Sequence, residues 1–284
     1  MEENNKEQGV LYLVATPIGN LGDITYRAVE VLKSVDFIAA EDTRRTLTLL
    51  NHLGISKPMT SYFEHNIRQK GEYITDRIIS GESVALVTDA GTPAISDPGE
   101  DIVKICIEKN IKVVPVPGAV AGISALICSG FSTQRFSFEG FLSMNRKNRM
   151  KHLEEVKNSP YTLIFYEAPH KLINTLSDML SCFGERKITI ARELTKKFEE
   201  IKQTNLKDAL SFYQENPPKG EFVLVIEGAQ IKEEENELNS LDLKEHLMHY
   251  INKGETKKDA IKLVAKDRGV PKREIYEQTI NLEI

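Results

Sequence analysis

Residues 84–99 read VALVTDAGTPAISDPG, an apolar run that ends in a loop with two glycines and two prolines. The unbroken run from Val84 to Val87 is typical of a strand that is buried on both faces, as in a parallel sheet. Asp89 then lies at the carboxyl edge of that sheet, where open α/β folds bind their ligands. Gly91 permits positive φ, and the prolines stiffen the loop, so we expect this loop to hold a ligand.

The same stretch predicts the start of the next helix. Asp97 precedes Pro98, a pair typical of an N-cap followed by the first helical residue, and we expect the helix to run to Lys109. The alternative interpretation of residues 84–99 is an ordinary turn between a strand and a helix.

Composition places the chain among soluble globular proteins and limits its partners. With 284 residues, 40% hydrophobic and 28% charged, it is long enough for about two domains. The formal net charge of −5 argues against indiscriminate coating of nucleic acid, although local basic faces stay possible. Neither the three cysteines nor the neighbouring His246 and His249 favour a metal site. No apolar stretch approaches the roughly 20 residues of a membrane-spanning helix, and the polar N-terminus is unlike a signal, so we expect a cytoplasmic protein without membrane or metal.

Strands and helices alternate up to about residue 230, which favours mostly parallel sheets. Several of the strands end in charged or small residues, as expected of a cleft between an N-terminal α/β lobe (1–117) and a second α/β lobe (118–230). The expected strands are 10–15, 37–40, 84–87, 112–116, 136–141, 161–166, 187–192 and 221–227.

Three charged or aromatic segments are candidates for binding. Glu41, Asp42, Arg44 and Arg45 crowd after the strand at 37–40, and the mixed aromatic segment 61–66 has Arg68 nearby. Residues 144–151 carry four basic side chains and no acidic one, which indicates a phosphate-facing patch. A solvated surface, or half-buried packing for the aromatic rings, is the alternative in each case.

The last part of the chain has a different character. We expect an acidic linker at 231–240 and a helix-turn-helix-like domain at 241–284, in which Gly269 ends one helix and Pro271 begins the next. Ala260, Ile261, Val264 and Ala265 share one face of the first of these helices, and Ile275 and Ile280 are expected to pack against it. Eight basic and three acidic residues between Lys253 and Arg273 favour contact with nucleic acid over a plain three-helix packing module.

Five segments together resemble one family. They are ATPIGNLGDITYRAV (15–29), AAEDTRRT (39–46), VTDAGTPAISDPG (87–99), VPGAVAGISAL (116–126) and FYEAPHK (165–171). The set resembles the branch of the tetrapyrrole methylase superfamily that methylates the ribose 2′-hydroxyl of a cytidine in 16S ribosomal RNA. The similarity spans about residues 10–228, and the C-terminal part resembles the small helix-turn-helix domain of this branch. Tetrapyrrole-modifying relatives carry G-x-G-P-G-D in the first loop, whereas this chain has TPIGNLGD at 16–23, which disfavours a precorrin substrate.

The resemblance implies two α/β lobes with a ligand cleft between them, a non-Rossmann methyltransferase fold, and a small C-terminal helical domain. It further implies S-adenosylmethionine in the cleft, the small ribosomal subunit or its RNA as substrate, and a homodimer. The residues that it implies for the donor site are Pro17, Asp89, Ala90, Gly91, Ala94, Ile95, Pro117, Gly118, Ser124 and Ala168.

Methyl transfer to a hydroxyl needs a group that accepts its proton. Carboxylates are the candidates, with Asp89, Glu167 and Glu41 ahead of Asp42 and Glu64. Phosphate contacts, which position an RNA rather than read its sequence, are expected from Arg44, Arg45, Arg68, Arg146, Lys147 and Arg149. The alternatives are a methylase of the same fold that acts on a tetrapyrrole or another small molecule, and a non-catalytic RNA-binding protein.

Overall fold

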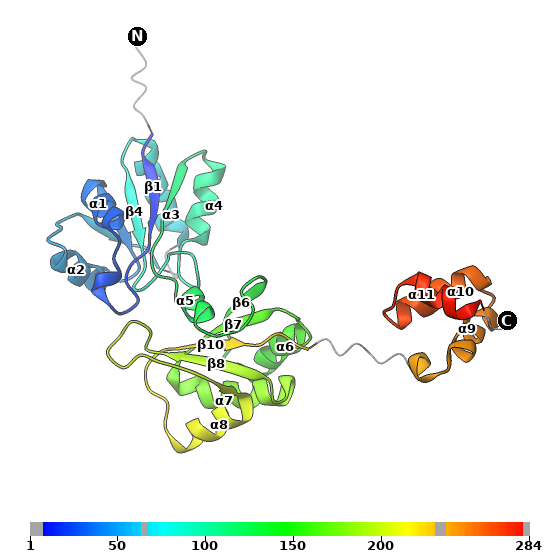
Figure 1. Cartoon of the computed structure of the whole chain (residues 1–284). Helices are drawn as coiled ribbons and strands as arrows, with labels where there is room; N and C mark the ends of the chain where they lie inside the picture. Colours follow the sequence, from blue (N-terminus) through cyan, green and yellow to red (C-terminus); the bar gives the residue numbers. More distant parts are fainter. Residues whose placement is uncertain (1–7, 64–66, 231–236, 281–284) are drawn as a thin grey trace, which may run out of the picture. The chain divides into compact units, whose positions relative to one another are not determined.

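The computed structural model describes residues 8–63, 67–230 and 237–280 (Figure 1). It divides into two units, Met1–Ala229 and Gln230–Ile284. Glu64, the polar N-terminal residues 1–7 and residues 231–236 of the predicted linker lie outside the described ranges.

The first lobe is a parallel sheet covered by helices on both faces. Its strand order is β3-β2-β4-β1-β5, so the decisive strand β4 lies in the middle, parallel to both of its neighbours. All four residues of β4 are buried, which confirms the predicted strand. Helices α1 and α2 pack on one face of the sheet, and α3 and α4 pack on the other. The strands are β1 (Val10–Val14), β2 (Phe37–Ala40), β3 (Met59–Ser61), β4 (Val84–Val87) and β5 (Lys112–Val116), and the helices are η1 (Leu21–Asp23), α1 (Tyr26–Ser34), α2 (Thr43–His52), α3 (Ile67–Ile79) and α4 (Glu100–Glu108).

Helix α4 begins later than its sequence signal indicates. Its N-cap is Gly99 at φ 153°, and its first residue is Glu100. The predicted cap at Asp97 is therefore wrong. The reason is that Ala94 and Ser96 adopt positive φ, which keeps the chain in a loop up to Gly99. The Asp97 side chain is thereby left to line a pocket.

The second lobe is a mixed sheet of order β6-β7-β10-β8-β9. β6 (Phe136–Phe141) is parallel to β7 (Thr162–Glu167), whereas β10 (Phe222–Ile226) is antiparallel to both β7 and β8 (Lys187–Arg192). A mostly parallel sheet is thus a wrong prediction for this lobe. The edge strand β9 (Glu200–Asn205) was not predicted, because its sequence EIKQTN has a single apolar residue.

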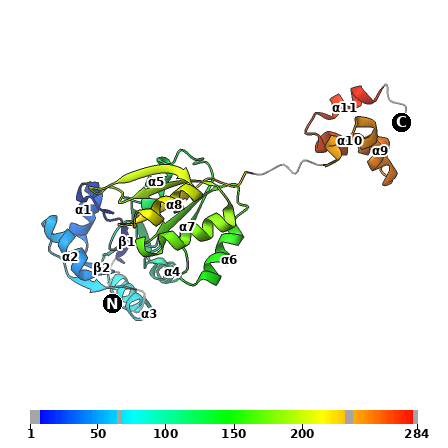
Figure 2. The same ribbon diagram turned by 90° about the horizontal axis from the view of Figure 1, so that it is seen from below.

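Helices also cover both faces of the second sheet. Helix α7 (Pro169–Phe183) packs between α6 (Arg146–Val156) and α8 (Leu206–Glu215), and the three form the main core with one face of the sheet (Figure 2). The short α5 (Ala121–Ile127) packs on the other face, against β7 and β10.

The second unit has a core of its own. It comprises η2 (Glu237–Ser240), α9 (Leu243–Asn252), α10 (Lys257–Asp267) and α11 (Lys272–Thr279). The predicted face of α10 is buried together with Leu247 and Ile275. Ile280 is 66% exposed, because α11 ends at Thr279, so its predicted packing is wrong. Among the described residues, no helix combines the length and the apolar character that crossing a bilayer demands.

Candidate active site

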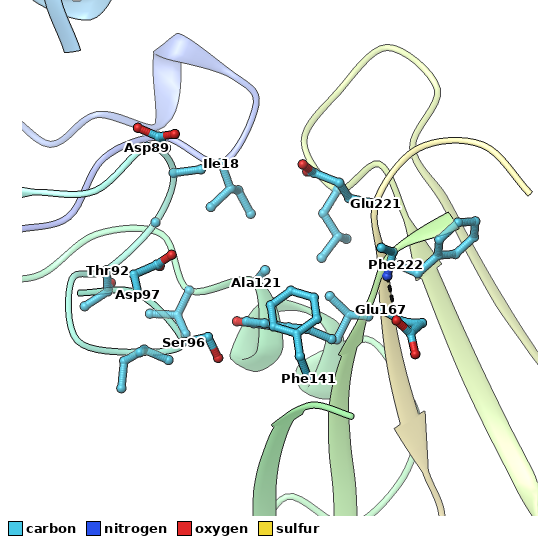
Figure 3. Close-up of a pocket in the computed structure, with 18 of the residues that line it drawn as sticks. Ile18, Asp89, Thr92, Ser96, Asp97, Ala121, Phe141, Glu167, Glu221 and Phe222 are labelled. Carbon is cyan, nitrogen blue, oxygen red and sulfur yellow. Dashed lines mark hydrogen bonds between the residues drawn. The ribbon is translucent and has the colours of Figure 1, made fainter. Parts of the chain in front are cut away.

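A pocket of about 480 Å³ lies between the two lobes of the first unit (Figure 3). The first lobe contributes residues that follow β1, β2 and β4. The second lobe contributes the ends of β6, β7 and β8 and the start of β10. Because β10 is antiparallel to β7 and β8, its start lies at the same sheet edge as their ends. The pocket therefore sits at the edges where α/β sheets bind ligands.

The loop after β4 is held in an unusual conformation. Thr16 and Gly91 exchange two backbone hydrogen bonds, of 2.8 and 3.1 Å, which tie this loop to the one after β1. Gly91 has φ 88°, and a Cβ there would lie 3.3 Å from Ile18. Ala94 and Ser96 also have positive φ, at 68° and 64°, although neither is glycine. Such residues cluster at functional sites because the surrounding structure must hold them.

Two of the pocket acids belong to a network that includes one arginine. Glu41 Oε2 accepts the Asp89 N–H at 3.2 Å, and Asp89 accepts the Asp42 N–H at 3.1 Å. Arg45 Nη1 lies 3.1 Å from Asp89 Oδ2. Burial raises the pKa of Glu41. Asp42 caps α2, and its hydrogen bonds to Arg44 lower the pKa of its carboxyl to about 2, so it serves the start of the helix.

Asp97 differs from the other pocket acids because it makes no hydrogen bond or ion pair within the described chain. Its carboxylate is directed into the space between the lobes (Figure 3). Burial raises the pKa of Asp97 to about 7, and the negative charges of Glu41 and Asp89 add to that effect. A carboxyl group that titrates near neutral pH in a cleft is suited to proton transfer.

Glu167 lies at the end of β7 and is buried. It accepts the Ala168 N–H at 2.9 Å and the Thr175 hydroxyl at 2.5 Å, and it pairs with Lys171 at 3.1 Å. Both of its oxygens are thus engaged by residues at the N-cap and in the first two turns of α7. Its geometry is that of a group that fixes the turn into α7.

The chain is similar in sequence to known proteins of one family. The family model described as Tetrapyrrole (Corrin/Porphyrin) Methylases matches residues 10–210. The chain belongs to this family. Two curated relatives are both named Ribosomal RNA small subunit methyltransferase I. The relative from Halalkalibacterium halodurans is 50% identical over 96% of each chain, and that from Bacillus subtilis is 50% identical over 98% of this chain and 96% of its own.

Solved structures show the same fold at low identity. Diphthine synthase has a TM-score of 0.59 at 15% identity, covering 78% of this chain and 90% of its own. Uroporphyrin-III-C-methyltransferase from Thermus thermophilus has a TM-score of 0.55 at 17% identity, covering 78% and 94%. The predicted fold class, two α/β lobes with a cleft between them and a C-terminal helical unit, is confirmed.

The ten residues predicted for the donor site of this methylase fall into two groups. The half that lines the pocket consists of Asp89, Ala90, Gly91, Ile95 and Ala168. The other half does not line it and consists of Pro17, Ala94, Pro117, Gly118 and Ser124. Gly118 allows a close approach, since a Cβ there would lie 2.8 Å from the Ala15 Cβ, and the Ser124 hydroxyl bonds the Val120 carbonyl at 2.9 Å. These two residues shape the chain behind the pocket wall.

The six basic residues predicted for RNA are dispersed. Arg45 lines the pocket, Arg44 is exposed beside Asp42, and Arg68 is exposed on α3. Arg146 and Lys147 are exposed in the first turn of α6.

Arg149 differs from these five because it is buried. Its guanidinium binds Asp178 and the carbonyl oxygens of Ser143 and Met144. We therefore correct the expectation for Arg149 and assign it to packing.

Sequence reasoning missed several pocket residues. Asp97 was interpreted as a helix cap, and the backbone strain that turns it inward has no sequence signal. Phe141 and Tyr166 were counted as strand residues, but both line the pocket at strand ends, where Tyr166 also accepts the Gly122 N–H at 3.0 Å. Glu221 and Phe222 come from the start of β10, whose antiparallel direction was not predicted.

Proposed function

We propose that this methylase transfers a methyl group from S-adenosylmethionine to the ribose 2′-hydroxyl of a cytidine in 16S ribosomal RNA. S-adenosylmethionine is the methyl donor of the family. The observation that carries the proposal is 50% identity over nearly the whole chain to enzymes named for methylation of small-subunit ribosomal RNA. The ribose position is the finer part of the proposal, and it comes from the motif resemblance.

The pocket fits the donor in size and chemistry. Its volume lies within the range of about 300–1,000 Å³ that is usual for small-molecule sites. The carboxylates of Asp89 and Asp97 suit the positive charges of the donor, and apolar residues such as Ala121, Leu194 and Val223 suit a flat base. When bound, the donor supplies an electrophilic methyl group on a sulfonium. Among the residues predicted from the sequence, Asp89, Ala90, Gly91, Ile95 and Ala168 would hold it.

The protein has to align the ribose hydroxyl with the methyl group of the donor, and it has to remove the hydroxyl proton. The two pocket walls, one from each lobe, can hold the ribose hydroxyl in line with the methyl group. This positioning supplies most of the rate acceleration. The Asp97 carboxylate would take the proton that the 2′-hydroxyl loses as the methyl group passes from the donor sulfur to the 2′-oxygen, and it would later release that proton to solvent. Asp97 is favoured over Asp89, Glu41 and Glu167, because those three are engaged by other protein groups.

Arg44 and Arg45 are proposed to contact RNA phosphates near the pocket. Both are exposed in the first turn of α2, and phosphate contacts from such groups set the register of an RNA on a protein. The enzyme is also proposed to be a homodimer. Light scattering checks this state, and the mass of a monomer at micromolar concentration would overturn it.

The proposal is tested with small ribosomal subunits from cells that lack this protein. Labelled S-adenosylmethionine and the purified enzyme are added, the RNA is digested, and the labelled nucleoside is identified by mass spectrometry. A 2′-O-methylcytidine from the 16S RNA is expected. Label on a base or on another nucleoside would overturn the ribose assignment. An absence of label from subunits and naked RNA alike, despite donor binding, would favour a small-molecule acceptor.

A further inference from the structure

An exposed aromatic ring stands at the second-lobe rim of the pocket. Phe141 ends β6, and it is 53% exposed although it lines the pocket. Tyr166 supports it edge-on with ring centroids 5.5 Å apart, and Lys171 Nζ lies 5.4 Å from its ring centroid. The ring projects toward the space between the lobes (Figure 3). A supported ring that keeps so much open surface is suited to stacking with a flat ligand.

The backbone of the loop that follows Phe141 is fixed by a buried arginine. Arg149 Nη1 donates to the carbonyl oxygens of Ser143 and Met144, at 3.0 and 3.2 Å. The same guanidinium pairs with Asp178 at 2.7 Å, and both side chains are buried. These hydrogen bonds fix the backbone at Met144, which is 74% exposed. A backbone that is already ordered loses little further entropy when a ligand binds beside it.

Charge distinguishes the start of α6 from the pocket walls. Residues 143–151 contain four basic side chains and no carboxylate, whereas the pocket walls carry Glu41, Asp89 and Asp97 from the first lobe and Glu167 and Glu221 from the second. Arg146 is 72% exposed, and the Asp178 that it contacts is already paired with Arg149. Lys147 is also exposed in the same helical turn. The exposed Arg146 and Lys147 therefore attract a polyanion to the start of α6.

We propose that Phe141 and Met144 form a stacking shelf for a nucleotide that neighbours the target cytidine, with Arg146 and Lys147 on its phosphates. The proposal rests on the proposed function. It adds that the RNA strand leaves the pocket over this shelf. Single-stranded RNA is bound in this way elsewhere, by aromatic platforms beside cationic side chains.

The test compares Phe141→Ala with Phe141→Trp in the full-length protein. The readouts are the Kd of a short fluorescent single-stranded RNA, by anisotropy, and the Kd of S-adenosylmethionine, by calorimetry. Loss of one stacked base is expected to weaken RNA binding about 5- to 100-fold in the alanine variant. The tryptophan variant is expected to bind RNA as wild type does. Phe136→Ala is the matched control, because Phe136 is a similarly exposed ring at the other end of β6 and does not line the pocket.

A second pair of variants tests the cationic part of the shelf. Lys147→Gln is expected to reduce the slope of log affinity against log salt by about 0.7, the value for one contact with single-stranded RNA. Lys33→Gln, an exposed lysine on α1, is expected to leave the slope unchanged.

The outcomes separate the shelf from the proposed function. Unchanged RNA affinity in Phe141→Ala, or a loss confined to the donor, would overturn the shelf even if RNA is methylated. Weakened RNA binding in that variant without any methyl transfer by the wild-type enzyme would support the shelf and overturn the proposed function.

Discussion

At the scale of single residues, the pocket acids differ in what they can do because their neighbours differ. Asp89 is held by Arg45 and by a backbone N–H, and Glu167 is held by Lys171 and Thr175. Asp97 faces the pocket without such partners among the described residues, and its pKa of about 7 makes its protonation state sensitive to pH near neutrality. The environment of each carboxylate, rather than its identity, thus assigns its role.

Replacing Asp97 with Asn is expected to lower kcat about 100-fold, because the proton acceptor is lost while the shape is kept. Asp97 accepts a proton only when it is ionised. The wild-type rate is therefore expected to rise with pH up to about pH 7 and to level off above it. Methyl transfer to small subunits at saturating donor, measured from pH 5 to 9, checks both points. Wild-type kcat in Asp97→Asn would contradict the assignment.

The same residue predicts a dependence of stability on pH. Because burial raises the pKa of Asp97 in the folded protein, its ionised form is disfavoured there, and stability is lost as the pH rises from about 4 through about 7. Asp97→Asn carries no such charge. The Tm of this variant is expected to exceed that of wild type at pH 8, with the difference shrinking towards pH 4. Thermal unfolding followed by circular dichroism measures it, and an equal difference at both pH values would contradict this view.

At the scale of elements, the buried pair Arg149–Asp178 joins α6 to α7 and fixes the loop after β6. Arg149→Ala would leave the buried Asp178 charge poorly compensated, so we expect a loss of about 3 kcal/mol in the free energy of unfolding. Arg146→Ala removes an exposed partner of the same aspartate and is expected to cost less than about 1 kcal/mol. Urea unfolding of both variants measures these values. Equal and small losses of unfolding free energy in the two variants would contradict the packing role of Arg149 and would make it a candidate for phosphate binding again.

Elements also show what the sequence could predict. The strand at Val84–Val87 and the buried face of α10 follow from local patterns, and the structure confirms them. The late start of α4 could not be predicted, since it depends on positive φ at Ala94 and Ser96, which tertiary contacts impose. The strand at 221–227 was predicted, but its antiparallel direction and the polar edge strand β9 were missed for a related reason. Which strands pair, and in which direction, depends on packing across the whole sheet and not on the local sequence alone.

At the scale of the whole molecule, the chain consists of an α/β unit and a helical unit, each with its own core. Ending the chain at Ala229 is therefore expected to leave the Tm of the α/β unit within a few degrees and the donor Kd within about twofold. The exposed lysines of α10 favour RNA contact, so the KM for small subunits is expected to rise several-fold. Calorimetry and methylation kinetics of the shortened chain check this. Loss of donor binding in the shortened chain would contradict the inference that the two units fold around separate cores.

We propose that methyl transfer takes place in the pocket between the two lobes of the first unit. A crystal structure with S-adenosylhomocysteine, the demethylated donor, tests this proposal. We expect the ligand between the loop Asp89–Asp97 and the Tyr166–Ala168 segment, with its sulfur facing the Asp97 carboxylate. A well-ordered ligand bound elsewhere on the chain, with this pocket filled by side chains, would show that methyl transfer takes place at another site.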